Sequence, residues 1–135
     1  GLPSTCHRAC DLCRDPELAL STLLDLGVAR VLTSGQAPSA PLGHERIRRF
    51  VVTAGDRLTV LAGAGVRDDN VAALVASTGV REVHLSATCW QPSGMTFRRD
   101  GVPMGSPVPH DEYTLRQTDA ALVARVRQAL ASMRG

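Results

Sequence analysis

The cysteines are the side chains of this sequence whose spacing most directly suggests chemistry. The chain has four, Cys6, Cys10, Cys13 and Cys89, and Cys10-Asp-Leu-Cys13 forms a CxxC motif. Thiolates at this spacing can converge on copper(I) or zinc or form a redox pair, and Cys6 and His7 lie close enough in sequence to add ligands. The alternative is that they are small buried apolar residues, which the lack of a second CxxC favours. Because three of the four crowd near the start, we expect reduced thiols and no secreted disulfide framework.

A glycine-rich turn within residues 58–70 suggests a second kind of site, one for an anion. A β-branched apolar run ends at Gly63-Ala64-Gly65, and Asp68 stands where a helix N-cap belongs, ahead of an apolar helical repeat. Glycines at such a corner let backbone amides approach a ligand, and a helix start adds unpaired N–H groups and the positive end of its dipole. Gly63 and Gly65 are therefore candidate anion-binding residues. The alternative is a tight turn that needs positive φ angles.

Polar residues also stand at the carboxyl ends of the other expected strands, namely His7 with Arg8, Ser34, and His84 with Ser86. An inward Arg8 could bind an anion through its guanidinium fork, and an inward His7 could move a proton or ligate a metal. His84 and Ser86 share one side of their strand because strand side chains alternate. We expect Arg8 and Ser86 to contact the anion, and His7, Ser34 and His84 to line a polar pocket beside it. The alternative is that these side chains have a structural role and cap the strand ends through hydrogen bonds.

One further candidate lies in the long segment near the C-terminus. Arg98 could reach an anionic ligand, and Met95, Phe97 and Met104 lie around it. Thioethers favour copper(I), but methionines near an aromatic ring more often pack a loop over the rim of a barrel. The segment DEY at 111–113 could anchor this arginine or cap the chain before the last helix, and both remain open.

The elements that must position these residues alternate between strands and helices. We expect strands over residues 2–9, 28–34, 58–61 and 81–86, and helices over 16–26, 44–54, 69–78 and from about 118 onward. Asp15-Pro16 supplies an N-cap and an N1 proline for the first helix, and Gly27 ends it. Residues 87–117 are predicted to be a long loop, because their four prolines exclude a long helix or a central strand.

Four consecutive strand–helix units require a parallel sheet and an α/β fold. Two architectures fit, an open doubly wound sheet or four βα units that form half of a TIM (β/α)8 barrel, whose complete form needs about 250 residues. Barrel proteins place their chemistry at the carboxyl ends of the strands, and phosphate often binds at the loops after the last two. In this chain those loops are AGAGV and HLSAT.

Length and charge limit the classes of function. The chain has 135 residues, 44% of them hydrophobic, and a net charge of +2, which indicates one domain or part of one. Its basic residues are mostly dispersed and it has four aromatic residues, so neither nucleic-acid binding nor a stacking surface is indicated. We expect no membrane association and a cytoplasmic location, because no apolar run approaches the roughly 20 residues that span a bilayer.

Six blocks in order resemble the C-terminal half of the CutC family of copper homeostasis proteins: CHRACD (6–11), ARVLTSGQ (29–36), AGAGVRDDN (62–70), EVHLSA (82–87), SGMTFR (93–98) and DEY (111–113). The resemblance implies a single TIM-barrel domain of about twice this length, of which residues 1–135 are a part that lacks the N-terminal half. It also implies copper(I) as cofactor or cargo, and a cytoplasmic location that can extend to the nucleus. Family members usually have Phe at Cys6 and Cys10, and the copper ligands proposed for animal members lie in the absent half.

Two hypotheses of different classes therefore stand side by side. The first is copper(I) binding or handling of the CutC type, with Cys6, Cys10, Cys13 and Cys89 as candidate ligands. The second is a barrel enzyme or binding protein for a small phosphorylated or other anionic ligand at the carboxyl ends of the strands; the sequence leaves enzymatic activity undecided. An isolated half barrel would expose two sheet edges and its apolar inner face, so we also expect self-association.

Overall fold

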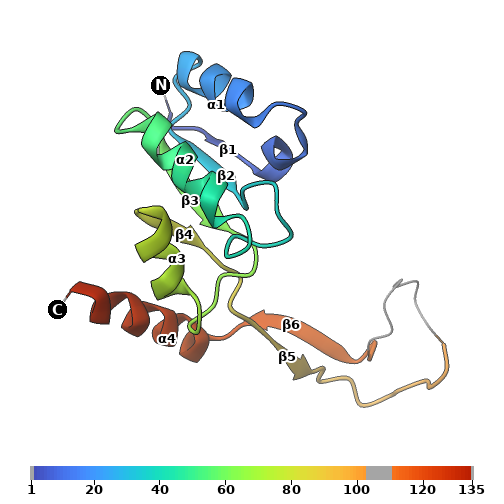
Figure 1. Cartoon of the computed structure of the whole chain (residues 1–135). Helices are drawn as coiled ribbons and strands as arrows, with labels where there is room; N and C mark the ends of the chain where they lie inside the picture. The colour runs from blue at the N-terminus through green and yellow to red at the C-terminus, as the bar shows by residue number, and fades with distance from the viewer. Residues whose placement is uncertain (1, 103–110, 135) are drawn as a thin grey trace.

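The computed structural model describes residues 2–102 and 111–134, and its centre is a four-stranded parallel sheet (Figure 1). The strands are β1 (Thr5–Cys6), β2 (Arg30–Thr33), β3 (Thr59–Gly63) and β4 (Glu82–His84), and they pair in chain order. The helices are α1 (Pro16–Asp25), α2 (His44–Ala54), α3 (Val71–Thr78) and α4 (Ala120–Ala131), with short 3-10 helices η1 (Arg8–Leu12) and η2 (Ser132–Arg134). The four βα units and the parallel sheet predicted from the sequence are confirmed.

Local signals in the sequence account for the helix boundaries. The side chain of Asp15 caps α1 by accepting a hydrogen bond from the Leu18 amide, with Pro16 at the first helical position. Asp119 caps α4 in the same way through the Ala121 amide. Within the described parts of the chain, no helix combines the length and the apolar composition that crossing a bilayer would require.

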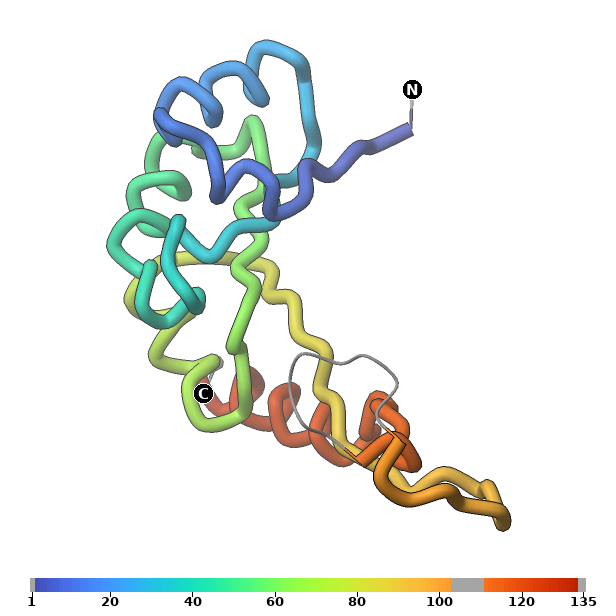
Figure 2. The backbone as a smooth tube through the Cα atoms, turned by 90° about the vertical axis from the view of Figure 1, so that its right-hand side faces the viewer, coloured from blue at the N-terminus to red at the C-terminus, as the bar shows by residue number. Residues whose placement is uncertain are grey.

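The hydrophobic core lies on one face of the sheet. Val31, Val60 and Ala62 are buried there, in one cluster with Ile47 and Phe50 of α2. The strand residues between them belong to the opposite face and are only half-buried. Figure 2 shows α1 to α3 gathered along one side of the sheet. A doubly wound sheet carries helices on both faces, so this one-sided arrangement is that of half a (β/α)8 barrel.

The first strand is shorter than the sequence predicted. Only Thr5 and Cys6 pair with β2, and the chain then turns into η1 with His7 as its N-cap. The Nδ1 atom of His7 accepts a hydrogen bond from the Ala9 amide at 3.0 Å. This local side-chain bond competes with the sheet ladder. His7 and Arg8 therefore follow the strand in a 3-10 turn, and the prediction that they end a strand was wrong.

The start of α3 also differs from the prediction. Its N-cap is Asn70, whereas Asp68 forms an ion pair with Arg125 of α4 at 2.6 Å. Asn70 accepts a hydrogen bond from the Arg67 amide and donates one to the Gly65 carbonyl, which closes a turn before the helix. The sequence near the turn cannot show whether Asp68 or Asn70 is the N-cap of α3. The answer depends on Arg125 of α4, which is more than 50 residues further along the chain.

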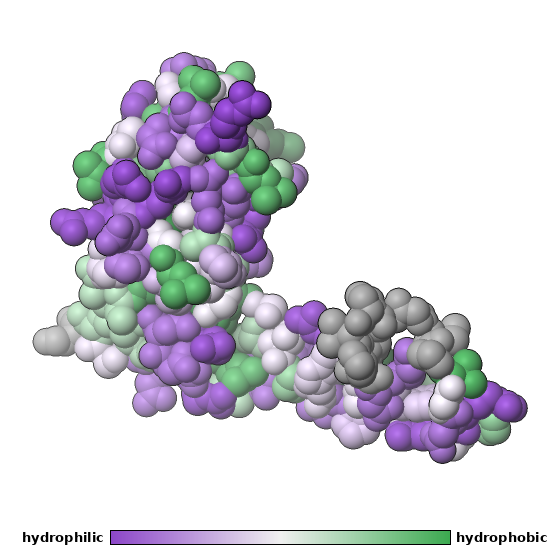
Figure 3. Space-filling model, turned by 45° about the vertical axis from the view of Figure 1, so that its right-hand side comes forward, coloured by the Kyte–Doolittle hydropathy of each residue, from purple (hydrophilic) through white to green (hydrophobic). Residues whose placement is uncertain are grey.

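Residues 87–117 are not only loop, as the sequence had predicted. Strands β5 (Thr88–Pro92) and β6 (Thr114–Thr118) form an antiparallel ribbon, which we call the arm together with the described residues between them. The arm projects away from the body of the molecule (Figures 1 and 3). Pro92 ends β5, which agrees with the expectation that proline excludes a central strand; Pro103, Pro107 and Pro109 lie outside the described residues.

Candidate functional site

A pocket of about 490 Å³ lies at the carboxyl end of the sheet. Its walls come from η1, β2, the turn after β3, the end of β4 and the first half of α4. Four residues that the sequence singled out lie together in it: Arg8, Gly65, His84 and Ser86. The remaining lining residues are Leu32, Ala64, Val66, Arg67, Asp68, Leu85, Ala87, Thr88, Leu122 and Val126. The volume falls within the ~300–1,000 Å³ range of small-molecule sites.

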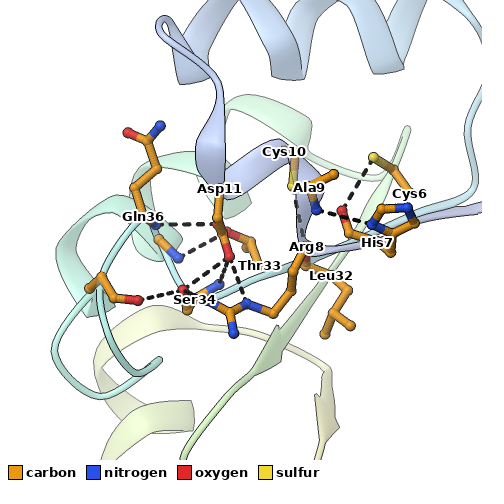
Figure 4. A network of polar contacts seen from close by, with 12 residues as sticks. Cys6, His7, Arg8, Ala9, Cys10, Asp11, Leu32, Thr33, Ser34 and Gln36 are labelled. Atoms are coloured by element: carbon orange, nitrogen blue, oxygen red, sulfur yellow. Dashed lines mark hydrogen bonds and ion pairs between the residues drawn. The ribbon is translucent and has the colours of Figure 1, made fainter. Parts of the chain in front are cut away.

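The carboxylate of Asp11 organises the edge of this pocket (Figure 4). Its Oδ1 accepts hydrogen bonds from the Thr33 hydroxyl at 2.5 Å and the Gln36 amide at 3.2 Å. Its Oδ2 accepts from the Ser34 amide at 2.9 Å, the Ser34 hydroxyl at 3.0 Å and Nε of Arg8 at 2.8 Å. Asp11 thus ties η1 to the loop that follows β2.

The ionisation of Asp11 follows from these bonds. Burial of the carboxylate opposes its charge, but the hydrogen bonds from Thr33, Ser34, Arg8 and Gln36 outweigh it and lower the pKa of Asp11 below its ordinary value. The Asp11 side chain is only 5% exposed. A nearly buried acceptor that is charged at neutral pH is therefore available to orient the guanidinium beside it.

Arg8 is held in place on two of its nitrogen atoms. Besides Nε on Asp11, Nη2 donates to the Ser34 hydroxyl at 2.8 Å, and 43% of the Arg8 side chain remains exposed. The single hydroxyl proton of Ser34 is shared between Oδ2 of Asp11, at 3.0 Å, and the Ala37 carbonyl, at 2.7 Å. Ser34 is buried and positions Arg8 from behind the pocket wall, so it is not part of the lining that had been predicted for it.

The glycine turn lines the pocket with its own backbone and does not place the first turn of a helix there. Ala64 and Gly65 both have positive φ angles, +79° and +70°, and both line the pocket. Gly63 is the last residue of β3, where a Cβ atom would stand 2.6 Å from Cδ1 of Leu32. Because residues 67–70 intervene, α3 does not start directly behind the glycines, and the predicted cradle of helix amides is not formed in that way.

His84 ends β4 and Ser86 lies two residues beyond it, and Leu85 between them lines the pocket as well. His84 and Ser86 both line the pocket and both are exposed, and the Ser86 hydroxyl is 3.4 Å from that of Thr88. Glu82, on the same side of the strand, lies deeper along the sheet face, where it pairs with Arg30 at 2.9 Å. Of the three polar residues that were expected on this side, only His84 and Ser86 therefore line the pocket.

Arg98 and His7 lie apart from the pocket lining. The Arg98 guanidinium stands over the Tyr113 ring, 5.1 Å from its centroid, on the arm. Asp111 caps the turn before β6 by accepting a hydrogen bond from the Tyr113 amide at 2.9 Å. In segment 111–113, Tyr113 therefore contacts Arg98, and Asp111 caps the turn before β6. Met104 lies outside the described residues.

The four cysteines are free thiols, and those of Cys6 and Cys13 lie near Cys10. Cys10 directs its sulfur at the Leu32 carbonyl, 3.5 Å away, and Cys13 accepts a hydrogen bond from Gln36 Nε2 at 3.7 Å. Burial raises the pKa of the Cys10 thiol to about 12, helped by the charge of Asp11 and the nearby thiols of Cys6 and Cys13. Cys89 lies on the arm. Within residues 2–102 and 111–134, no three His, Cys, Asp or Glu side chains are grouped as a metal site.

Sequence reasoning missed the part of the pocket that α4 builds. Leu122 and Val126 supply apolar wall, and Arg125 fixes Asp68 at the rim. The apolar periodicity of α4 was visible in the sequence, but its position was not, because the arm separates it from β4. A signal did exist for the Asp11 cluster, since Arg8 and Asp11 stand three residues apart in one short block.

Comparisons with known proteins agree with this architecture. The profile of the CutC family matches residues 1–89. The chain is 46% identical over 129 residues to a CutC family protein of Vibrio vulnificus (strain YJ016) and 48% identical over 126 residues to one of Chromobacterium violaceum. These matches cover 96% and 93% of this chain and 51% of each relative, so the chain spans about half the length of the curated relatives it matches.

A solved structure extends the likeness to three dimensions. It is the crystal structure of a CutC protein from Streptococcus agalactiae, whose name assigns it provisionally to copper homeostasis. The superposition has a TM-score of 0.59 with 28% sequence identity and covers 62% of this chain and 42% of the other. A matching family profile over most of the chain, relatives above 40% identity and a similar solved fold together show that this chain belongs to the CutC family.

Proposed function

We propose that the pocket at the carboxyl end of the sheet binds a small compound with an anionic group such as phosphate or carboxylate. The observation that carries this proposal is the fixed guanidinium of Arg8, which lines the pocket while Asp11 and Ser34 hold it from behind. An arginine whose orientation is set in advance loses less conformational entropy when it binds an anion.

The rest of the lining fits a ligand with one polar and one apolar end. Hydroxyl groups of Ser86 and Thr88 lie on the arm side of the pocket, and Leu85, Leu122 and Val126 supply apolar surface. Asp68 also lines the pocket, but its charge is paired with Arg125, which lowers the pKa of Asp68 through a direct hydrogen bond. Its repulsion of an anion is therefore reduced.

Thermal unfolding with inorganic phosphate tests this proposal. We expect phosphate to raise the melting temperature of the wild-type chain, because a ligand that binds only the folded state stabilises it by mass action. Arg8→Ala and Ser86→Ala should each reduce the shift; the Ser86 change leaves the Asp11 cluster intact and so keeps the fold. The matched control is Arg48→Ala, which removes an exposed guanidinium from α2. A shift that survives both pocket variants, or no shift at all, would contradict the proposal.

We propose copper(I) handling as a second candidate, which the copper-homeostasis name of the Streptococcus agalactiae protein suggests. In this chain it is supported by the proximity of Cys6 to Cys10, since the Cys6 thiol is close enough to contribute to the raised pKa of Cys10. Copper(I) is a soft ion that binds thiolates, and a pair of sulfur atoms is sufficient for a linear site. We place this function in the cytoplasm, with the nucleus as a second location.

Competition with a copper(I) chelator tests the second candidate. Because the pKa of Cys10 is raised to about 12, metal binding must displace a proton, so the apparent affinity should increase as pH rises. Cys10→Ser should abolish stoichiometric uptake, and Cys89→Ser on the arm should leave it unchanged. Equal loss in both variants, or binding independent of pH, would exclude a Cys6–Cys10 site.

A further inference from the structure

The two cysteines of the CxxC motif share one turn of 3-10 helix. Cys10 lies within η1 and Cys13 is its C-cap, and the Cys13 amide donates a hydrogen bond to the Cys10 carbonyl at 3.3 Å. In a 3-10 helix, residues three apart lie one above the other, with their Cα atoms about 6 Å apart. Disulfides usually span Cα separations of about 4.4 to 6.8 Å, so the backbone of this turn is suited to a bridge.

Both sulfur atoms face the same neighbouring segment, the end of β2 and the loop that follows it. Sγ of Cys10 is 3.5 Å from the Leu32 carbonyl oxygen, and Sγ of Cys13 is 3.7 Å from Nε2 of Gln36. Both thiols are free and half-buried. The two sulfur atoms therefore lie on the same side of the turn, as a bond between them requires.

From this arrangement we propose that Cys10 and Cys13 form a reversible disulfide that controls the anion pocket. The oxidant is a small organic disulfide such as glutathione disulfide. One cysteine thiolate attacks a sulfur of the oxidant and expels a thiolate, and the second cysteine then attacks the first and expels the other half of the oxidant. The two cysteines lose two protons and two electrons, and the oxidant leaves as two thiols.

Gln36 connects this cysteine pair to Asp11. Its Nε2 donates a hydrogen bond to the Cys13 carbonyl at 2.7 Å, and its backbone amide donates to Oδ1 of Asp11 at 3.2 Å (Figure 4). The Arg46 guanidinium donates to Oε1 of Gln36. The φ angle of Gln36 is +57°, which residues with a Cβ atom rarely adopt. Gln36 therefore depends on these contacts to keep its conformation.

Closing the disulfide would loosen the support of Arg8. Bringing the sulfur atoms to about 2.05 Å draws Cys13 toward Cys10 and away from Gln36. Asp11 lies inside the ring that the bond closes, and it would lose the amide of Gln36 as a donor. Because the same carboxylate holds Nε of Arg8 at 2.8 Å, the oxidised chain should bind an anion more weakly than the reduced chain. This control rests on the proposed function, whereas the disulfide itself does not.

A reversible disulfide also agrees with the cytoplasmic location proposed above. In that compartment thiols are kept reduced, and the disulfides that do form are usually transient and either catalytic or redox-sensing. The reduced state is the one in which Gln36, Asp11 and Arg8 are held together, so the pocket would bind its ligand under reducing conditions and release it on oxidation.

Oxidation in a glutathione redox buffer tests whether the pair forms. We expect peptide mass spectrometry without reductant to find a bond between Cys10 and Cys13. Trypsin cleaves after Arg8 and Arg14, so this bond stays within one peptide, whereas a bond to Cys6 joins two peptides. A Cys6 linkage, a mixed disulfide with glutathione as the end product, or no linkage at all would overturn the proposal.

Hydrogen exchange of the Gln36 amide tests the structural effect without any ligand. Oxidation should make this exchange about tenfold faster, the change that losing one hydrogen bond produces. The oxidant should leave the exchange rate unchanged in Cys13→Ser. The matched control Cys89→Ser, which removes a thiol from the arm, should respond as the wild type does. Equal exchange in oxidised and reduced wild type would show that the disulfide does not reach the Asp11 cluster.

Melting curves with inorganic phosphate separate this inference from the proposed function. The phosphate concentration that gives half of the full stabilisation should be about tenfold higher for the oxidised chain than for the reduced chain. Equal concentrations for the two forms overturn the control by the disulfide. If the reduced chain shows no stabilisation by phosphate, the anion site itself is contradicted, and the disulfide linkage and the Gln36 exchange still decide whether the cysteine pair acts on the Asp11 cluster.

Discussion

Asp11 in the body and Asp111 on the arm use the same carboxylate group in different ways. Asp11 accepts hydrogen bonds from Arg8, Thr33, Ser34 and Gln36, most of them 22 to 25 residues away in sequence. The carboxylate of Asp111 accepts from the Tyr113 amide two residues away. Long-range bonds tie separate elements into one site, whereas the local bond shapes only its own turn.

Glycines show the same difference between the two regions. In the body, a Cβ atom at Gly43 would overlap the Ser34 carbonyl oxygen, and one at Gly35 would overlap the Gly43 carbonyl oxygen. On the arm, a Cβ atom at Gly94 would meet nothing within 4 Å. The loop that holds the Asp11 cluster is therefore packed backbone against backbone, and the arm is open. Substitutions in the body should be costly where their counterparts on the arm are not.

The largest effect is expected for Asp11→Asn. The amide would turn an N–H group toward donors that now share the carboxylate, and Arg8 would lose its charged partner. We expect the free energy of unfolding to fall by about 3 kcal/mol, measured by urea denaturation. Asp111→Asn is the matched control on the arm and should cost less than about 1 kcal/mol. Equal costs would show that the long-range bonds of Asp11 contribute nothing special.

Gly43→Ala should have the next largest effect. Its new methyl group must displace the Ser34 backbone and with it the Asp11 hydrogen bonds, so we expect a loss of about 2 kcal/mol. Gly94→Ala should leave stability within about 0.5 kcal/mol of the wild type, since the site is open. Chemical denaturation midpoints measure both. A tolerated Gly43→Ala would mean that the loop after β2 can move without disturbing the cluster.

Lowering the pH should reduce the stability of the body of the molecule, because Asp11 becomes protonated. Because the folded-state pKa of Asp11 is lowered, the unfolded chain takes up the proton first, and stability falls with decreasing pH. The contribution should be complete above the ordinary aspartate pKa of about 3.9 and be lost as pH falls through the lower folded value. Urea midpoints measured against pH should drop less steeply for Asp11→Asn. If the urea midpoint of Asp11→Asn fell as steeply with decreasing pH as that of the wild type, Asp11 would not be the group responsible.

Tyr113→Phe on the arm should have the smallest global effect. The Tyr113 hydroxyl accepts from the Arg99 amide at 2.5 Å and donates to the Arg99 carbonyl at 3.3 Å, so its loss loosens the arm alone. We expect faster hydrogen exchange of the Arg99 amide and a melting temperature close to that of the wild type. A large drop in melting temperature would show that the arm and the body unfold together.

Much of the fold was predictable because its signals are local. Asp15-Pro16 located α1, and apolar runs that end at glycine turns located β2 and β3, because caps and short apolar runs involve only a few neighbouring residues. The candidate site was predictable in part: Arg8, Gly65, His84 and Ser86 were named from their places at strand ends and do share one pocket. Arg98 was named from the long segment before the last helix, and its guanidinium stands over the Tyr113 ring of the arm, apart from the pocket.

The sequence by itself determined the order of strands and helices, the parallel sheet and the family to which the chain belongs. Only the tertiary structure decided that Asp11 holds Arg8, that Asp68 pairs with Arg125 and that residues 88–118 contain a ribbon. The physical reason is distance along the chain. Secondary-structure propensity and apolar periodicity depend on residues that are close in sequence. The hydrogen-bond partners of a buried carboxylate are instead the donors that tertiary packing places within about 3 Å of it.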